Sequence, residues 1–465
     1  MRFAASKLSV AAIALAALFG SACQTTSTGP VNTNAGNRPA LTASAPGGSP
    51  LSPTIPGDAD FSDLPANPTI QQIQHDFDVF SWQSFVALNW SPDQSQIIGS
   101  VQDGDNPTVW GTYIESYQVF LPEGQAPQWN SRDVPPICQP DPNTTVKLPV
   151  FRMTMKVSDQ VLNFSQQAFG TGPLIDQRGE YVRYSINLNQ DAFNYILNNK
   201  LYNKEAQKNF TNVNFPIAAA PSPTPSSSPN PGTVGSIVLK SAWRILDATK
   251  GDVLSRYHKI DAYVYTPPSG DPPTKPSCER KTLGLVALHI AHKTASAPQW
   301  VWSTFEQVDN VAVGPNAPAG LKPSFFNADC KDCRINKPPP KPWDPNVATK
   351  PSQITRLLPL DDPTKQLNTE WQGFLVGVNK NSVWQFYQLI STQWPANATR
   401  SPTGDPAPQF LANTAVETYI QGKVPNVSSS CIMCHNNATT TTSAFADFSY
   451  LLERAQSSQP KEPKK

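Results

Sequence analysis

Proline is the residue that most constrains the fold of this chain. The sequence has 48 prolines among 465 residues, which is about twice the average usage. Proline has a fixed φ and no backbone N–H, so it interrupts both helices and central strands. We therefore expect short helices, short strands and long connecting loops, and we exclude a bundle of long helices.

The remaining composition is that of a folded protein with little net charge. Hydrophobic residues make up 38% of the chain and include 11 Trp, 21 Phe and 12 Tyr, enough to build a sizeable core and to exclude disorder throughout. The 36 basic and 35 acidic residues leave a formal net charge of +1. A chain so close to neutrality has no electrostatic reason to bind nucleic acid or an acidic membrane surface.

The N-terminus has the pattern of a secretory signal peptide over residues 1–22. Basic residues precede an apolar run over residues 8–19, and small residues follow it;. Cys23 comes directly after them, which predicts a bacterial lipoprotein acylated at Cys23. Gly20 stands where lipoprotein signals usually carry leucine, so a secreted protein with a spare thiol is the alternative. We expect an exported, periplasmic protein anchored to the membrane through Cys23.

Composition divides the rest of the chain into further parts. Residues 23–68 are rich in Pro, Ser and Thr and predict a flexible tether;. Residues 69–336 predict a β-rich body with a disordered Pro/Ser-rich insertion at 218–234;. Residues 337–456 predict a mainly helical region, and residues 457–465 form a basic tail;. The expected fold class is α+β, with a β-rich central body, peripheral short helices and a helical C-terminal region.

Hydrophobic periodicity places the individual elements of these parts. Helical spacing is found at 70–90 and, later in the chain, at 365–374, 383–394, 411–421 and 448–456. Short runs of β-branched and aromatic residues predict strands at 148–157, 181–188, 236–246, 258–265 and 283–292;.

The strongest sign of chemistry is Cys431-Ile432-Met433-Cys434-His435. Cys-x-x-Cys-His is the attachment sequence of c-type haem. The two thiols form thioethers with the haem vinyl groups, which holds the adjacent imidazole under the iron. We therefore predict one covalent haem c at Cys431 and Cys434, with His435 as the proximal iron ligand. Export agrees with this prediction, because such a haem is attached outside the cytoplasmic membrane.

The sixth ligand of the iron stays open at this point. Methionine commonly takes this position, but none follows His435. Met153 and Met155 alternate in a strand-like segment and would face the same way;, although core packing is the ordinary role of such residues. His289 and His292 would lie on opposite faces of a strand, so at most one of them is available;. Water or an open position is the remaining alternative.

Four further cysteines are Cys138, Cys278, Cys330 and Cys333. The last two form a second Cys-x-x-Cys, but Arg334 follows it, and arginine stays protonated and cannot ligate iron. In an oxidising compartment these four cysteines predict disulfides, with three pairings possible. A redox-active pair and a structural zinc site are weaker alternatives.

Five strings of this sequence carry a resemblance to a known family: Phe80–Trp90, Pro298–Asn310, Val383–Leu389, Cys431–His435 and Asp447–Leu452. They resemble a family of secreted bacterial c-type cytochromes, the cytochrome c family proteins with a C-terminal Cys-x-x-Cys-His. The resemblance covers most of the chain from about Ile70 to Gln456. It implies haem attachment at Cys431 and Cys434 with His435 on iron, in the periplasm, and it supplies no substrate.

Two classes of function fit these observations. The first is a carrier that transfers one electron with a periplasmic or membrane redox partner, because the chain has one covalent haem site and is exported. The second is a haem enzyme of the peroxidase or oxygenase type, or a haem-based sensor, with an open sixth position. The size of the β-rich body motivates this alternative. We favour the carrier, and the sequence identifies no catalytic residue.

Overall fold

The computed structural model describes residues 50–95, 97–99, 107–131, 134–138, 148–152, 171–219, 233–266, 268, 275–340, 350–400 and 402–458. They belong to one unit of the chain, Asn37–Lys465. The signal peptide, Cys23, Met153 and Met155 lie outside the described residues, as do most of the insertion at 218–234 and most of the basic tail.

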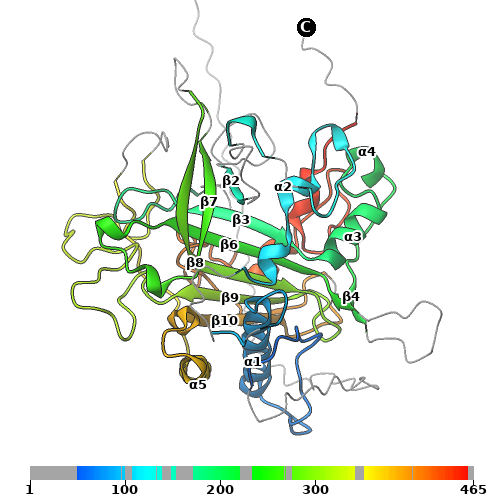
Figure 1. The fold of residues 1–465 in the computed structure, drawn as a ribbon. Coiled ribbons are helices and arrows are strands. Elements are labelled where there is room, and N and C mark those ends of the chain that lie inside the picture. The colour runs from blue at the N-terminus through cyan, green and yellow to red at the C-terminus, as the bar shows by residue number, and fades with distance from the viewer. Residues whose placement is uncertain are drawn as a thin grey trace, which may run out of the picture. The chain divides into compact units, whose positions relative to one another are not determined.

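A large sheet with a few mostly short helices forms the fold, which confirms the predicted α+β, β-rich class (Figure 1). Among the described residues, nine strands join in the order β1-β3-β6-β8-β9-β10-β11, with β7 beside β8 and β2 beside β7. Only β2 and β7 pair in parallel in this part of the chain. The strands are β1 (Ile114–Glu115), β2 (Val150–Arg152), β3 (Arg183–Leu188), β6 (Ile237–Ile245), β7 (Lys259–Thr266), β8 (Ser277–His292), β9 (Val301–Gln307), β10 (Tyr387–Pro395) and β11 (Pro406–Ala407), with a separate pair β4 (Ile217–Ala219) and β5 (Thr233–Gly235).

The long strand β8 organises the sheet. It pairs with β6 along one edge, and β7 and β9 follow one another along its other edge. His289 of β8 lies opposite Lys240 of β6 and Thr304 of β9, and Ala291 lies opposite Trp302. Directly paired residues point to the same face of a sheet. Lys240, His289, Trp302 and Thr304 therefore share one face.

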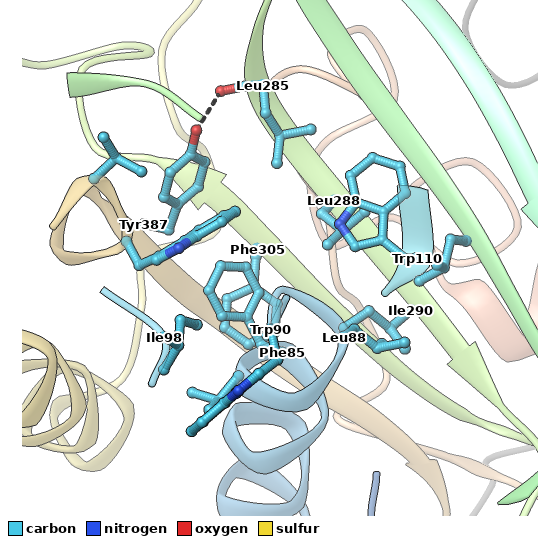
Figure 2. Packing of buried hydrophobic residues seen from close by; sticks show 14 of the residues in the cluster. Phe85, Leu88, Trp90, Ile98, Trp110, Leu285, Leu288, Ile290, Phe305 and Tyr387 are labelled. Atoms are coloured by element: carbon cyan, nitrogen blue, oxygen red, sulfur yellow. Dashed lines mark hydrogen bonds between the residues drawn. The ribbon is translucent and has the colours of Figure 1, made fainter. Parts of the chain in front are cut away.

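The other face of the sheet is covered by two helices, α1 (Ile70–Leu88) and α5 (Asp362–Val378). Thr69 begins α1 with a capping box, which satisfies the first free N–H groups of the helix;. Phe85 of α1 stacks on Phe305 of β9, with ring centroids 4.3 Å apart (Figure 2). Aromatic packing of this kind joins the helix layer to the sheet.

The face that carries His289 is covered by shorter helices and by the C-terminal segment, and its hydrophobic cluster includes Trp302. Two isolated parallel bridges, Asn203 with Gln456 and Asn212 with Phe445, tie the C-terminal segment to the region around α4. The helices here are α2 (Ser116–Val119), α3 (Gln190–Asn198), α4 (Lys204–Gln207) and α6 (Cys431–His435).

Most of the predicted elements of the body are confirmed. The strands expected at 181–188, 236–246, 258–265 and 283–292 correspond to β3, β6, β7 and β8, and the helices expected at 70–90 and 365–374 correspond to α1 and α5. The sequence does not predict β9. Its residues are buried on both faces, so they lack the alternation that marks a half-exposed strand.

The helix predicted over 383–394 is wrong. A short 3-10 turn, Val383–Phe386, leads directly into β10. β10 pairs with β9, and Thr392 of β10 lies opposite Ser303. The apolar residues of this segment have helical spacing, but the segment forms a strand. Its hydrogen bonds to β9 and its β-branched residues Ile390 and Thr392 favour the extended conformation;.

Two more helices predicted in this part differ from the structure. Residues 411–421 form turns, because their polar groups bond to the sheet: the Asn413 amide donates to the Thr304 hydroxyl (2.9 Å);. Of the helix predicted over 448–456, only a short 3-10 helix, Tyr450–Arg454, is formed. The C-terminal part of the chain is therefore less helical than its sequence predicts.

Candidate functional site

The Cys-x-x-Cys-His sequence forms a single helical turn, α6, directly after Ser430. Gln393 of β10 holds the start of the turn: its side chain accepts from the Ile432 N–H (2.8 Å) and donates to the Ser430 hydroxyl (3.1 Å). Ile432 itself is fully buried, whereas Cys431 and Cys434 are partly exposed. The turn is thus fixed to the sheet, with both cysteines half-buried.

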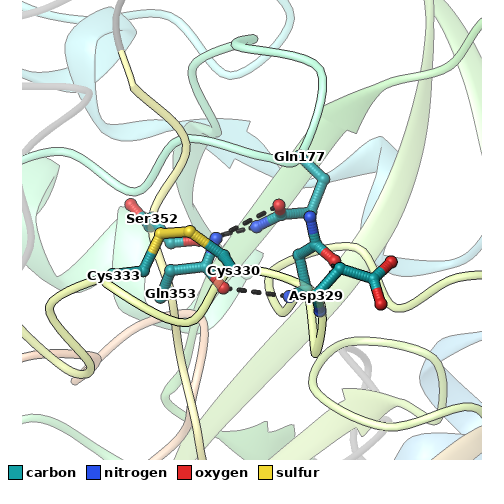
Figure 3. Close-up of a disulfide and its surroundings, with 7 residues drawn as sticks. Gln177, Asp329, Cys330, Cys333, Ser352 and Gln353 are labelled. Atoms are coloured by element: carbon teal, nitrogen blue, oxygen red, sulfur yellow. Dashed lines mark hydrogen bonds between the residues drawn. A yellow bond between two sulfur atoms is a disulfide. The ribbon is translucent and has the colours of Figure 1, made fainter.

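The four cysteines outside this turn are paired in the structure. Cys138 is joined to Cys278 of β8. Cys330 is joined to Cys333, in a loop next to Gln353 (Figure 3). Of the three pairings that the sequence left open, the structure contains the one that joins Cys138 to Cys278 and Cys330 to Cys333.

Cys431 and Cys434 are unpaired thiols. Burial is the main cause that raises the pKa of both thiols, and the negative charge of Glu417 raises them further. Both groups are therefore protonated at neutral pH, unlike the low-pKa thiolates of redox-active cysteine pairs.

The imidazole of His435 is held in one orientation. Its Nδ1–H donates to the carbonyl oxygen of Phe448 (2.7 Å), which leaves Nε2 with its lone pair. The ring lies against Trp302 and Tyr450, with centroids 4.4 and 5.2 Å away, and the Tyr450 hydroxyl donates to the Cys434 carbonyl (2.8 Å). Burial lowers the pKa of His435 to about 4, so the ring is neutral, the form that ligates metals.

The sheet face that contacts α6 through Trp302 is rich in polar and charged groups. We call this surface the site face and define it by Lys240, His289, Trp302, Thr304 and Glu306, which the strand register places together. A segment at residues 413–417 covers part of it, and the Thr414 N–H donates to the Glu306 carboxylate (2.6 Å). Arg356 pairs with the same carboxylate (2.5 Å), so Glu306 is a satisfied buried charge.

His289 of the site face has a buried ring nitrogen that lacks a hydrogen bond within the described residues. This nitrogen, Nε2, lies 3.4 Å from the carboxylate of Glu417. Burial lowers the pKa of His289 to about 3 and raises the pKa of Glu417 to about 7. A positive charge on His289 would also lower the pKa of His435, so the two imidazoles lie in one electrostatic neighbourhood.

Of the other predicted candidates for a sixth ligand, His292 is the one that the structure describes, and it does not lie on the site face. His292 faces the opposite side of the sheet, where its Nε2 is 2.6 Å from the Val234 carbonyl and its ring lies against Phe80. Met153 and Met155 lie outside the described residues. His289 and His292 thus lie on opposite faces of the sheet, as their alternation in the sequence predicts;.

Several residues around α6 have no sequence signal of their own. Trp302 and Glu306 belong to a string quoted for the family resemblance, yet nothing in that string assigns them to the site. Lys240 and Glu417 are single charged residues on β6 and in a turn. Only the register of the sheet and the course of the chain over it bring these four residues together at the site face.

Comparisons of the chain with family models, with curated proteins and with solved structures yield no match. Across the described ranges, no helix combines the length and the apolar character needed to span a membrane. The interpretation of this site therefore depends on the Cys-x-x-Cys-His motif and on the geometry around it.

Proposed function

We propose that this protein is a periplasmic c-type cytochrome with a single haem that transfers one electron at a time. The haem c would be attached to Cys431 and Cys434, with His435 on the iron. One observation carries the proposal: the two motif thiols are unpaired on a single turn with His435, while the four other described cysteines form disulfides.

The residues present fit such a group. A c-type haem needs from the chain two thiols and one imidazole rather than a cluster of three or more ligands, and the described residues hold no such cluster;. His435 has its Nδ1 occupied by Phe448, so Nε2 is the nitrogen left for iron. A backbone acceptor at the far nitrogen of a metal-binding imidazole fixes its tautomer and its ring orientation. Bound haem would supply an iron that changes between ferric and ferrous states.

The surroundings of His435 suit electron transfer. Trp302 and Tyr450 lie against its ring, and Ile432 is fully buried below the turn. These side chains keep the imidazole from reorienting, which limits the rearrangement that accompanies a change of charge. The proposed partner is a periplasmic or membrane redox protein, since the sequence predicts export and a lipid anchor at Cys23.

A pair of double variants tests the haem assignment. We expect the denatured wild-type protein to keep haem colour and the Cys431→Ala/Cys434→Ala variant to lose it. The matched control is Cys330→Ala/Cys333→Ala, which removes the other Cys-x-x-Cys and should keep the colour. Colour retained in the first double variant would refute attachment at Cys431 and Cys434.

Within this proposal, His289 is the candidate for the sixth ligand among the described residues, because it is the histidine of the site face. Glu417 competes for its Nε2 at 3.4 Å. We expect His289→Ala to change the ferric absorption spectrum from low-spin to high-spin, and His292→Ala, on the opposite face, to leave it unchanged. Met153→Ala and Met155→Ala test the alternative, since a change of the ferrous spectrum in either one would favour methionine over His289.

A haem enzyme or sensor with an open sixth position is the second candidate, and one observation favours it. His289 and Glu417 form an imidazole–carboxyl pair beside the site, and such pairs transfer protons to and from reacting ligands. The purified ferric protein decides between the two functions. A low-spin iron that does not respond to cyanide or peroxide supports the carrier, whereas a high-spin iron that consumes peroxide supports the enzyme.

A further inference from the structure

The loop that holds the carbonyl acceptor of His435 has an unusual backbone. Asp447 and Phe448 are consecutive residues with φ of 49° and 66°. This left-handed region is uncommon for residues other than glycine, and two in succession persist only where the surroundings hold them. The carbonyl that accepts from His435 Nδ1 belongs to the second of these residues.

A buried ion pair holds this backbone in place. The ammonium group of Lys293 contacts the carboxylate of Asp447, and both side chains are nearly inaccessible, 2% and 6% exposed. The Phe215 N–H donates to the same carboxylate (2.7 Å), and Lys293 also donates to the Asn214 amide oxygen (2.6 Å). Every one of these groups has a partner, as a buried charge requires.

The ion pair connects the sheet to the loop whose Phe448 carbonyl accepts from His435. Lys293 is the residue directly after β8, so its position is set by the sheet. Its N–H donates to the Ser236 carbonyl (3.0 Å). Asp447 therefore ties the loop to a rigid point, and the next peptide along the loop presents its carbonyl to His435.

We propose that Lys293 and Asp447 are positioning residues for His435. Their ion pair fixes the left-handed backbone at 447–448 and thereby aims the Phe448 carbonyl at the Nδ1–H of the imidazole. The inference rests on the proposed haem function and adds a determinant of the reduction potential. A strong acceptor at Nδ1 makes the imidazole a better electron donor to iron and favours the ferric state. Loss of the Lys293–Asp447 ion pair should therefore raise the reduction potential of the haem.

The experiment uses the haem-loaded protein and the variants Asp447→Asn and Lys293→Met/Asp447→Asn. The double variant leaves no unpaired buried charge and should fold even where the single variant does not. We expect both to keep covalent haem, to shift the reduction potential upward and to change the signals of the proximal imidazole in paramagnetic NMR. Lys293→Arg, which keeps the charge, should stay closer to the wild type than either.

Asp309→Asn is the matched control. Asp309 forms another buried ion pair, with Arg256 at 2.6 Å, and the other hydrogen bonds of its carboxylate within the described residues are to Gln307 and Gly314, not to α6. Its loss should lower the melting temperature and leave the potential unchanged. Wild-type potential and imidazole signals in the Lys293→Met/Asp447→Asn variant would overturn the inference. Absence of covalent haem in the wild-type protein would instead refute the proposed function.

Discussion

Trp302 and His435 contact each other through their rings, with centroids 4.4 Å apart and ring planes inclined at 46°. Trp302 belongs to β9, and His435 ends the turn α6, so this contact joins the site face to the Cys-x-x-Cys-His sequence. The indole N–H of Trp302 donates to the Gln299 carbonyl (2.9 Å), which fixes the orientation of the ring. A residue of the sheet thus helps to set the place of the candidate iron ligand.

Replacing Trp302 should destabilise the protein. The side chain is 8% exposed, and truncation of a buried aromatic residue to alanine costs about 3–5 kcal/mol. We expect Trp302→Ala to lower the free energy of unfolding in urea by that amount, and Trp302→Phe to lower it by less. Equal stability of the alanine variant and the wild type would show that the indole is not a packing element of this site.

The two disulfides should contribute unequally to stability. Cys138 and Cys278 are separated by 140 positions, whereas Cys330 and Cys333 are separated by 3. Closing the longer loop removes more entropy from the unfolded chain, about 5 kcal/mol against about 2 kcal/mol. The Cys138→Ala/Cys278→Ala variant should therefore melt at a clearly lower temperature than Cys330→Ala/Cys333→Ala, and the reverse order would contradict the loop-entropy argument.

Asp78 of α1 predicts a pH dependence of stability. Its buried carboxyl accepts from the Gln74 amide (2.9 Å) and the Thr364 hydroxyl (2.8 Å), and burial raises its pKa from 3.8 to about 6. The folded state holds this proton more tightly than the unfolded chain does. Its stabilising contribution is therefore complete below pH 3.8 and is lost as the pH rises through about 6;.

The variant Asp78→Asn tests this dependence because its side chain does not titrate. Relative to the variant, the wild type should lose up to about 3 kcal/mol of unfolding free energy between about pH 4 and pH 6. Urea unfolding at several pH values measures the difference. A constant difference across this range would mean that Asp78 is ionised in the folded protein throughout.

Arg183 of β3 carries a buried charge. The side chain donates to the Tyr181 carbonyl (3.1 Å), and its Nε has no hydrogen-bond partner among the described residues. No carboxylate in the part of the chain that the structure describes pairs with it, and burial lowers the pKa of Arg183 to about 10. We expect Arg183→Met to stabilise the protein by about 1–3 kcal/mol in chemical unfolding.

Arg244 gives the opposite expectation and serves as the control. It is buried as well, but its guanidinium pairs with Asp176 and Asp252, each at 2.7 Å. Arg244→Met removes the closer partner of both carboxylates, which keep only Arg178, at 3.5 Å from Asp176 and 3.0 Å from Asp252. It should destabilise by about 3–5 kcal/mol. Changes of the same sign in the two arginine variants would show that partner geometry does not decide the outcome.

The parts of the fold that follow from local patterns could be predicted, and the others could not. β3, β6, β7 and β8 are marked by short runs of β-branched and aromatic residues, and α1 is marked by its hydrophobic spacing. β9 and β10 are buried among other elements, so their sequences carry no alternation;. Pairing with distant strands decides their conformation, and such pairing is not encoded in a window of ten residues.

The candidate site divides in the same way. Cys431, Cys434 and His435 are contiguous, so their chemistry can be inferred from spacing alone. Trp302 and Glu417 reach them from β9 and from a turn that precedes α6. The position of these two residues beside the motif depends on the register of the sheet and on the path of the chain across it. A single sequence specifies neither.

The bridges that join Asn203 to Gln456 and Asn212 to Phe445 bear on the order of folding. Each closes a very long loop of chain, and contacts between distant positions form slowly because the entropy of loop closure opposes them until the rest of the structure exists. The segment that carries Cys431 and Cys434 should therefore dock after the sheet has formed. Until then its two thiols stay open to a covalent reaction, and docking afterwards would lock the modified turn in place.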